Sequence, residues 1–240
     1  MFAKITKELN SLANKNQAKI LHGFFKTGPE QYGEGDIFLG IKVPAQRMVA
    51  SKFKNLSLKD AEDLLHSKYH EHRLTALIIL VNQFKAGDEK LREKIYKLYL
   101  KNTRWINNWD LVDLSAHYII GAYLLDKPRD LLYKLAKSKM LWERRIAIIS
   151  TYAFIRAFDF KDTLKLSELL LGDKEDLMHK AVGWMLRELG KKSAIGEKEL
   201  TSFLDKYALA MSRTCLRYAI ERLDEEKRIY YLNLGKGQRR

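Results

Sequence analysis

Five apolar segments that recur at nearly equal spacing constrain the fold of this 240-residue chain more than any other feature. They begin at Glu71, Trp109, Glu143, His179 and Arg213, so consecutive starts lie 38, 34, 36 and 34 residues apart. Shorter stretches with helical spacing, such as EKLREKIYKLYL and TLKLSELLLGD, lie between them. A period of about 34 to 47 residues with two helices per repeat is typical of an α-solenoid, in which neighbouring pairs bury each other's apolar faces. The spacing predicts an all-α fold, a right-handed α-solenoid of helical pairs with a concave surface.

The remainder of the chain also favours helix, because only three prolines occur and alternating strand patterns are scarce. Residues 1–26 read as two short helices or one broken helix, followed by a polar, glycine-rich loop over residues 27–36. A further helix is expected to begin near Ala45. We expect residues 1–234 to form one domain and residues 235–240, GKGQRR, to form a loose basic tail.

The charge balance predicts a polyanionic partner. The 44 Lys and Arg residues exceed the 30 Asp and Glu residues, giving a net charge of +14, so nucleic acid is the leading candidate. A membrane surface is the other candidate, but no apolar run approaches the roughly 18 to 20 residues of a spanning helix, and no signal-peptide core is present. We therefore expect a cytoplasmic, nucleoid-associated protein. The one cysteine, Cys215, excludes an internal disulfide and is expected to be a small buried apolar residue.

The second repeat carries an acid in an otherwise apolar helical run. Asn107 or Asn108 can cap this helix, and Asp110 in its first turn suits the helix dipole. Trp109 and Asp113 are four residues apart and share one face, which places an aromatic plate beside a carboxylate. The structural alternative makes Trp109 a core residue and Asp113 the partner of an arginine.

Basic and aromatic side chains recur at equivalent places in the other repeats. Such residues on one surface would bind phosphates with salt-sensitive, sequence-independent affinity, while the aromatic rings would lie against sugars or bases. The alternative for any one of these residues is an ordinary solvated charge or a packed ring. The predicted DNA-binding residues are Lys42, Arg47, Arg73, Arg144, Lys180, Arg187, Arg213 and Arg217.

Five segments, in this order, resemble one known family: GPEQYGEGDIFLGIKVPAQR, NNWDLVDLSA, WERRIAI, HKAVGWMLRELGK and RTCLRYAIERL. The chain is similar over almost its whole length to the AlkD-type DNA alkylation repair glycosylases, which are built from HEAT-like repeats. The resemblance implies hydrolysis of the N-glycosidic bond of N3- and N7-alkylated purines in duplex DNA, without base flipping. It assigns the catalytic acid to Asp113, the flanking tryptophans to Trp109 and Trp184, and the active-site arginine to Arg145, with the adjacent Arg144 left open.

The chemistry of an alkylated purine fits these residue types. The damaged base is already a cationic leaving group, so a carboxylate such as Asp113 would mainly stabilise the oxocarbenium-like sugar and orient a water molecule. Arg145 would keep the acid ionised, and the tryptophans would offer electron-rich faces to the cation. No lysine stands out as a Schiff-base nucleophile, so a monofunctional glycosylase is expected. It would act on duplex DNA as a monomer without a cofactor.

Two other readings of the sequence remain. Some members of the wider superfamily lack the Trp and Asp set and bind branched DNA, so the alternative function is a non-catalytic HEAT-like module that binds damaged or branched DNA. His66 and His70 have the i, i+4 spacing of metal ligands, but a third ligand is missing from the motif and we expect no metal. The glycines of YGEGD lack the Lys-Ser/Thr of a phosphate-binding loop and are expected to shape a turn.

Overall fold

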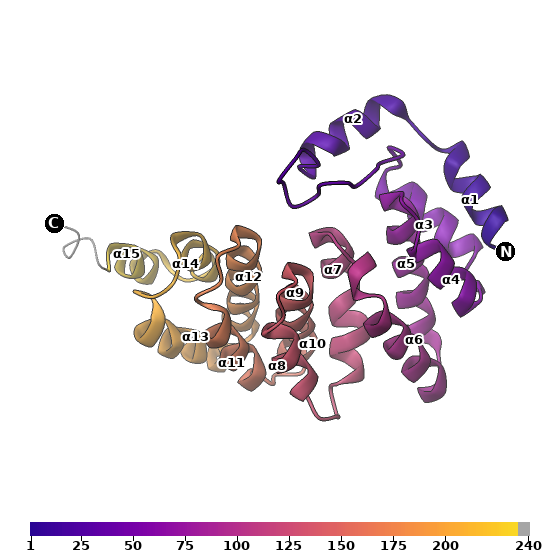
Figure 1. Ribbon diagram of the computed structural model, residues 1–240. Helices are drawn as coiled ribbons and strands as arrows, with labels where there is room; N and C mark the ends of the chain where they lie inside the picture. The colour runs from indigo at the N-terminus through magenta and orange to yellow at the C-terminus, as the bar shows by residue number, and fades with distance from the viewer. Residues whose placement is uncertain (235–240) are drawn as a thin grey trace. The chain divides into compact units, whose positions relative to one another are not determined.

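The computed structural model describes residues 1–234, and over this range the chain forms helices and no β-strand (Figure 1). One isolated bridge joins Ile37 to Tyr69. The predicted all-α class, with helices in consecutive pairs, is therefore confirmed. The basic tail expected at residues 235–240 lies outside the described residues.

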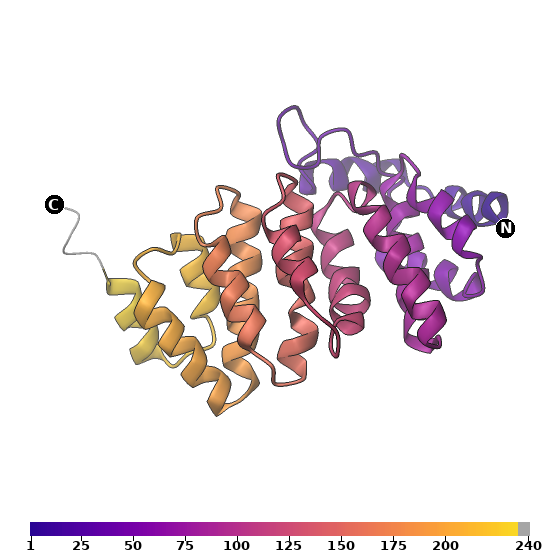
Figure 2. The same cartoon turned by 60° about the horizontal axis from the view of Figure 1, so that its bottom comes forward.

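The helices belong to two compact units, which we describe separately: unit 1 covers residues 1–119, and unit 2 follows from residue 120. The helices of unit 1 are α1 (Phe2–Ser11), α2 (Lys15–Phe24), α3 (Val43–Lys52), α4 (Leu58–Leu65), α5 (His70–Ala86), α6 (Glu89–Lys101), the 3-10 turn η1 (Thr103–Trp105) and α7 (Trp109–Ala116). A π-helical turn, η2 (His117–Gly121), continues α7. The helices of unit 2 are α8 (Asp130–Ala136), α9 (Leu141–Ser150), α10 (Tyr152–Arg156), α11 (Lys161–Leu170), α12 (Asp176–Lys192), α13 (Ala194–Tyr207), α14 (Arg213–Ala219) and α15 (Glu225–Asn233) (Figure 2).

Helix α5 is the centre of unit 1 and packs against α3, α4, α6 and α7. Its sequence, HEHRLTALIILVNQFKA, is apolar on every side in its middle, and a helix of this kind is stable only when it is surrounded. Leu77, Ile79 and Leu80 are fully buried. Burial of each such side chain contributes about 1.5 to 3 kcal/mol, so the packing around α5 holds unit 1 together.

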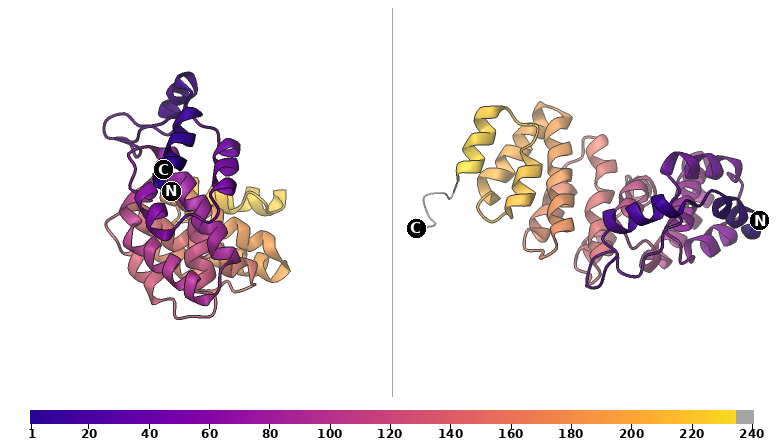
Figure 3. Two further views of the ribbon diagram at one scale, coloured as in Figure 1. Left: turned by 90° about the vertical axis from the view of Figure 1, so that its right-hand side faces the viewer. Right: turned by 90° about the horizontal axis from the view of Figure 1, so that it is seen from above.

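The connection between α2 and α3 packs against the start of α5 within unit 1. We call residues 25–42 the α2–α3 loop; Figure 3 shows it in dark violet beside the N-terminal helices. At Gly40 the backbone has φ +84°, and a Cβ there would lie 2.1 Å from the carbonyl oxygen of Asn14. Glycine is therefore required at this position by both conformation and space. The two short helices expected within residues 1–26 are α1 and α2, and the helix expected near Ala45 begins at Val43.

Helix α12 has the same central place in unit 2, where it packs against α9, α11, α13 and α14. It approaches α14 closely at Gly183. A Cβ at Gly183 would lie 2.5 Å from both the carbonyl oxygen of Cys215 and the Cβ of Tyr218. The glycine thus lets the two helices touch through their backbones. Cys215 is buried in this contact, as predicted, and burial raises the pKa of its thiol to about 12.

No helix among residues 1–234 is both long enough and apolar enough to cross a membrane.

Candidate functional site

The first turn of α7 presents the predicted aromatic and acidic pair. Asn108 caps the helix: its side-chain oxygen accepts a 2.8 Å hydrogen bond from the backbone N–H of Trp109. Asp110 accepts a 2.9 Å bond from the N–H of Leu111, so the acid expected near the helix dipole is in place. Trp109 and Asp113 follow one turn apart on α7, and both are partly exposed. Trp109 is therefore not a fully buried core residue.

The Trp109 ring is held by the α2–α3 loop and the end of α2. It stacks on Phe25 with ring centroids 5.3 Å apart and meets the edge of Phe24 at 6.0 Å. Its indole N–H donates to the hydroxyl of Tyr32 over 3.3 Å. Phe25 in turn stacks on Phe38. The sequence predicted a polar, glycine-rich loop here but gave no role to these aromatic residues. The signal that could have identified them is the density of aromatic side chains between residues 24 and 38.

A buried histidine lies between two carboxylates beside this aromatic cluster. The Nδ1 of His70 is 2.8 Å from Oδ2 of Asp36, and its Nε2 is 2.8 Å from Oδ2 of Asp110. We call Asp36, His70 and Asp110 the histidine clamp. It connects the α2–α3 loop, the start of α5 and the start of α7, and thus joins three separate parts of the sequence.

Charge in the clamp shifts the pKa of His70 and of Asp36. Burial favours a neutral His70, but the charge and hydrogen bond of Asp110, together with Asp36, outweigh it and raise the pKa of His70 to about 9. Burial also opposes ionisation of Asp36, yet the bond from His70 and the charge of Arg73 lower the pKa of that carboxyl to about 2. His70 and Asp36 are therefore both charged near neutral pH.

Arg73 must be corrected, because we expected it on the DNA-facing surface. Its side chain is 3% exposed and forms an ion pair with Asp36 in the interior of unit 1. Its Nη1 also donates to the carbonyl oxygen of Ser67 over 3.0 Å. The position i+3 from His70 in the first turn of α5 directs the guanidinium inward, so Arg73 stabilises the loop and is not available to a phosphate.

The histidine pair considered for a metal is divided between two different contacts. His66 bonds through Nε2 to Oδ1 of Asn102 at 2.6 Å, whereas both ring nitrogens of His70 face the carboxylates of the clamp. No group of three or more His, Cys, Asp or Glu side chains that could hold a metal ion occurs within the part of the chain that the structure describes.

Unit 2 carries the other two residues of the predicted set. Trp184, on α12, is partly exposed, and its indole N–H donates to Oε1 of Glu188 over 3.2 Å. The ring of Tyr152 lies 6.2 Å away, centroid to centroid. Arg145, on α9, is 5% exposed and donates from Nη1 to the carbonyl oxygen of Leu177. Glu188, which sequence reasoning missed, thus fixes the orientation of the indole.

Two of the predicted DNA-binding arginines are engaged in ion pairs within unit 2. Arg144 donates from Nε to Asp173 over 2.6 Å and from its two terminal nitrogens to Asp173 and to backbone carbonyls. Arg187 bridges Glu188 and Glu221 at 3.0 and 2.6 Å. These contacts occupy the guanidinium groups, so both arginines have structural partners that a DNA phosphate would have to replace.

The remaining predicted DNA-binding residues lie nearer the surface. Lys42, Arg47 and Arg217 are exposed, and Arg213 and Lys180 are partly exposed. Lys180 pairs with Asp176 one turn earlier at 2.7 Å, an exposed contact of low energy. Its ammonium can therefore move to another anion at little cost.

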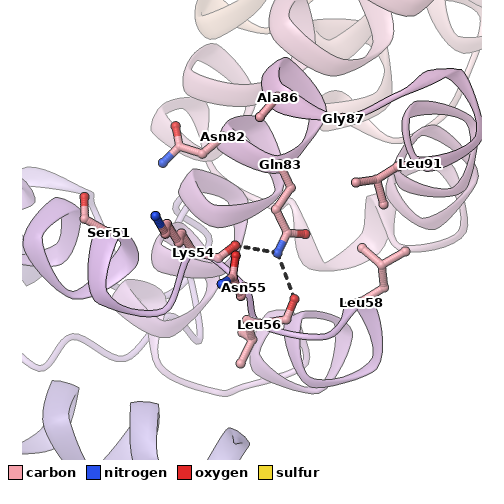
Figure 4. A pocket seen from close by; sticks show the side chains of 10 residues that line it. All are labelled: Ser51, Lys54, Asn55, Leu56, Leu58, Asn82, Gln83, Ala86, Gly87 and Leu91. Carbon is pink, nitrogen blue, oxygen red and sulfur yellow. Dashed lines mark hydrogen bonds between the residues drawn. The ribbon is translucent and has the colours of Figure 1, made fainter.

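A separate hollow of about 610 Å³ lies in unit 1 between α3, α5 and α6. Figure 4 shows Gln83 reaching across it to donate to the carbonyl oxygens of Lys54 and Leu56, both over 2.8 Å. Gln83 is thirteen residues beyond His70 on α5, which corresponds to about 20 Å along the helix. The hollow is therefore distinct from the surroundings of Trp109.

One family model matches almost the whole chain. The family model described as DNA alkylation repair enzyme matches residues 5–223. A solved structure described as a predicted DNA alkylation repair enzyme from Enterococcus faecalis matches with a TM-score of 0.68 and 14% identity, covering 89% of this chain and 97% of that chain. This likeness shows that the fold is shared. A comparison with curated proteins found no match. Because the family model spans almost the entire chain, this protein belongs to the DNA alkylation repair enzyme family.

Proposed function

We propose that this protein is a monofunctional DNA glycosylase that releases positively charged N3- and N7-alkylated purines from duplex DNA. The observation that carries the proposal is the pair on α7: Trp109 and Asp113 lie one turn apart, and both are partly exposed. Membership in a DNA repair family supports an action on damaged DNA. A module that only binds a polyanion gains nothing from an acid at such a surface, because the carboxylate repels phosphates.

The reaction would place Asp113 near C1' of the damaged nucleotide. As the bond to the cationic base breaks, positive charge develops on the deoxyribose, and a fixed carboxylate stabilises this charge more in the transition state than in the ground state. The same carboxylate would orient the water molecule that attacks the sugar. Trp109 would offer its electron-rich face to the cation. The resemblance to AlkD-type enzymes assigns Trp184 and Arg145 to the same reaction.

This electrostatic chemistry would also provide selectivity. Undamaged purines are poor leaving groups, so stabilisation of the sugar cation alone would not release them. An enzyme of this kind has no need to extrude the base, and it avoids the energetic cost of flipping. We expect the basic residues Lys42, Arg47, Lys180, Arg213 and Arg217 to contact phosphates. Such contacts position the duplex without reading its sequence.

The direct test is incubation of the purified protein with methylated duplex DNA, followed by chromatography of the released bases. We expect N3-methyladenine or N7-methylguanine above the spontaneous background. A protein that binds this DNA but releases no base would instead support the alternative, a non-catalytic module for damaged or branched DNA. In that case a preference for branched over linear duplex, measured by titration, would establish the second function.

A further inference from the structure

The geometry around His70 favours a doubly protonated ring. Each of its nitrogens lies 2.8 Å from a carboxylate oxygen, one from Asp36 and one from Asp110. An ionised carboxylate only accepts hydrogen bonds, so both ring nitrogens must donate, and only the imidazolium carries two N–H groups. The side chains of His70 and Asp36 are each 2% exposed, so water does not compete for the bond between them. Asp110 is 17% exposed.

The groups that surround the ring support this charge. Arg73, on the same helix, neutralises Asp36 from its far side, and Asn108 donates to Oδ2 of Asp36 over 3.3 Å. The carboxylates of Asp36 and Asp110 are thus paired with the cations of His70 and Arg73. From α2, His22 meets the edge of Phe38, whose face stacks on His70 at 4.6 Å.

The neighbours of His70 on α5 bond to other partners. Glu71 accepts the backbone N–H groups of Leu39, Gly40 and Ile41 at 2.9, 2.7 and 3.1 Å. The ring of His72 bonds to Ser67 and Asn10. Among the groups facing the imidazolium, only the Asp36 and Asp110 carboxylates contact its nitrogens in the described structure.

The histidine clamp links the two chain segments that position Trp109, the α2–α3 loop and the first turn of α7. Asp36 follows Tyr32 by four residues in the α2–α3 loop, and the Tyr32 hydroxyl accepts the indole N–H of Trp109. Asp110 directly follows Trp109 on α7. His70 therefore fixes the loop that contacts the indole ring and the helical turn that carries it.

We propose that His70, as an imidazolium between Asp36 and Asp110, is a positioning residue that fixes Trp109 and the first turn of α7 for action on DNA. The part of this proposal that concerns DNA rests on the proposed glycosylase function. The part that concerns Trp109 rests on the contacts alone. Loss of the ring proton would remove the hydrogen bond from His70 to one of the two carboxylates, and the loop and α7 would be held together less firmly.

The test follows Trp109 in the complete protein labelled with 5-fluorotryptophan. The ¹⁹F resonance of Trp109 is assigned by its disappearance in Trp109→Phe and recorded from pH 6 to pH 10. We expect one shift with a midpoint near pH 9 in the wild type, the pKa to which the two carboxylates raise His70. In Asp110→Asn, one stabilising charge is lost, and the midpoint should fall by about one pH unit or more.

His70→Gln should remove the step and show a displaced Trp109 resonance already at pH 7, because an amide has one donor side and cannot serve two carboxylates. At pH 7.5 its single-turnover release of N7-methylguanine should be slower on the order of tenfold, since misplacement of a positioned group has effects of this size or larger. His66→Gln is the matched control, a histidine at the end of α4 outside the clamp. It should behave as the wild type in both measurements.

The outcomes separate this proposal from the proposed function. A Trp109 resonance in His70→Gln that matches the wild type at every pH overturns the positioning role. If His70→Gln does not fold, an unmoved midpoint in folded Asp110→Asn overturns it instead. If the resonance depends on His70 and Asp110 as expected while the wild type releases no methylated base, the clamp stands and the glycosylase function is wrong.

Discussion

Trp109 is positioned by residues that are far from it in the sequence. Phe25 supports one face of the ring, Tyr32 accepts its N–H, and the histidine clamp fixes both the loop and the helical turn. An aromatic ring held in this way cannot rotate freely away from the surface. If Trp109 contacts DNA as proposed, its ring is already in place before binding, which would lower the entropic cost of forming the complex.

Replacement of Asp113 by asparagine tests the chemical role of the acid. The amide keeps the size and removes the negative charge, so excision of N7-methylguanine at saturating protein should slow by at least about tenfold, or roughly 1.4 kcal/mol. DNA affinity should remain or increase, because the carboxylate repels phosphates in the ground state. Single-turnover kinetics and a binding titration measure the two effects.

The matched control for this variant is Asp63→Asn, which removes an exposed carboxylate on α4. Its excision rate should equal that of the wild type. If Asp113→Asn instead excises normally but binds DNA poorly, Asp113 has a structural role and the catalytic assignment is wrong.

Local spacing predicted the residues of α7 but not their partners. The cap at Asn108 and the shared face of Trp109 and Asp113 follow from helical periodicity. By contrast, His70 meets Asp36 and Asp110 across 34 and 40 residues, and no local pattern encodes such contacts. Arg73 was assigned to DNA because a sequence shows charge and does not show burial.

At the level of helices, the contact between α12 and α14 depends on one glycine. Gly183→Ala would place a methyl group 2.5 Å from the backbone oxygen of Cys215, and the helices would have to separate. Such overpacking costs about 1 to 3 kcal/mol, which should appear as a lower midpoint of urea unfolding. Because Trp184 is the next residue, its fluorescence should change as well.

Gly172→Ala is the control for this helix contact, since a Cβ at Gly172 meets nothing within 4 Å. Its unfolding midpoint should match or exceed that of the wild type, because alanine restricts the unfolded chain. Equal stability of the two variants would show that α12 can move away from α14 at no cost.

The helix pattern of the sequence was sufficient for fold class and approximate boundaries. All five aligned segments lie on helices α5, α7, α9, α12 and α14, because apolar periodicity determines which faces can be buried. The α2–α3 loop could not be derived in the same way. Its conformation is fixed by Glu71, His70 and Arg73, which lie on a helix about thirty residues later.

At the scale of the whole molecule, the net charge of +14 predicts salt-sensitive DNA binding. Five phosphate contacts would give a slope of roughly −4.5 in a plot of log K against log salt. Arg217→Gln should reduce the magnitude of this slope by about 0.9, similarly for all duplex sequences. Lys90→Gln removes the same charge from α6, outside the predicted DNA-binding residues, and should leave the slope unchanged. A flat salt dependence would contradict the proposed phosphate contacts.

His70 and His72, two residues apart on α5, should give the free energy of unfolding a maximum near pH 6.5. The folded pKa of His70 is raised to about 9, so its contribution is complete below pH 6.5 and is lost as the pH rises through 9, by roughly 3 kcal/mol at most. Burial, and then the charge of Arg73, lower the pKa of His72 to about 4, so its protonation in the unfolded chain destabilises the protein as the pH falls from 6.5 to 4.

Urea unfolding at a series of pH values measures both slopes. His70→Gln should remove the alkaline decline and leave the acid decline in place, whereas His72→Gln should weaken only the acid decline. An alkaline decline of equal size in His70→Gln would assign it to other groups.

The carboxylate of Glu71 has a consequence for the accessibility of the α2–α3 loop. It receives the amide protons of Leu39, Gly40 and Ile41, which in an ordinary loop would exchange with solvent deuterium within seconds. Here these three protons are released only when α5 loses its first turn. We therefore expect residues 39–41 to exchange at the slow rate of the helical interior, and proteases to cut the exposed segment around Glu30 well before they reach the chain near Gly40.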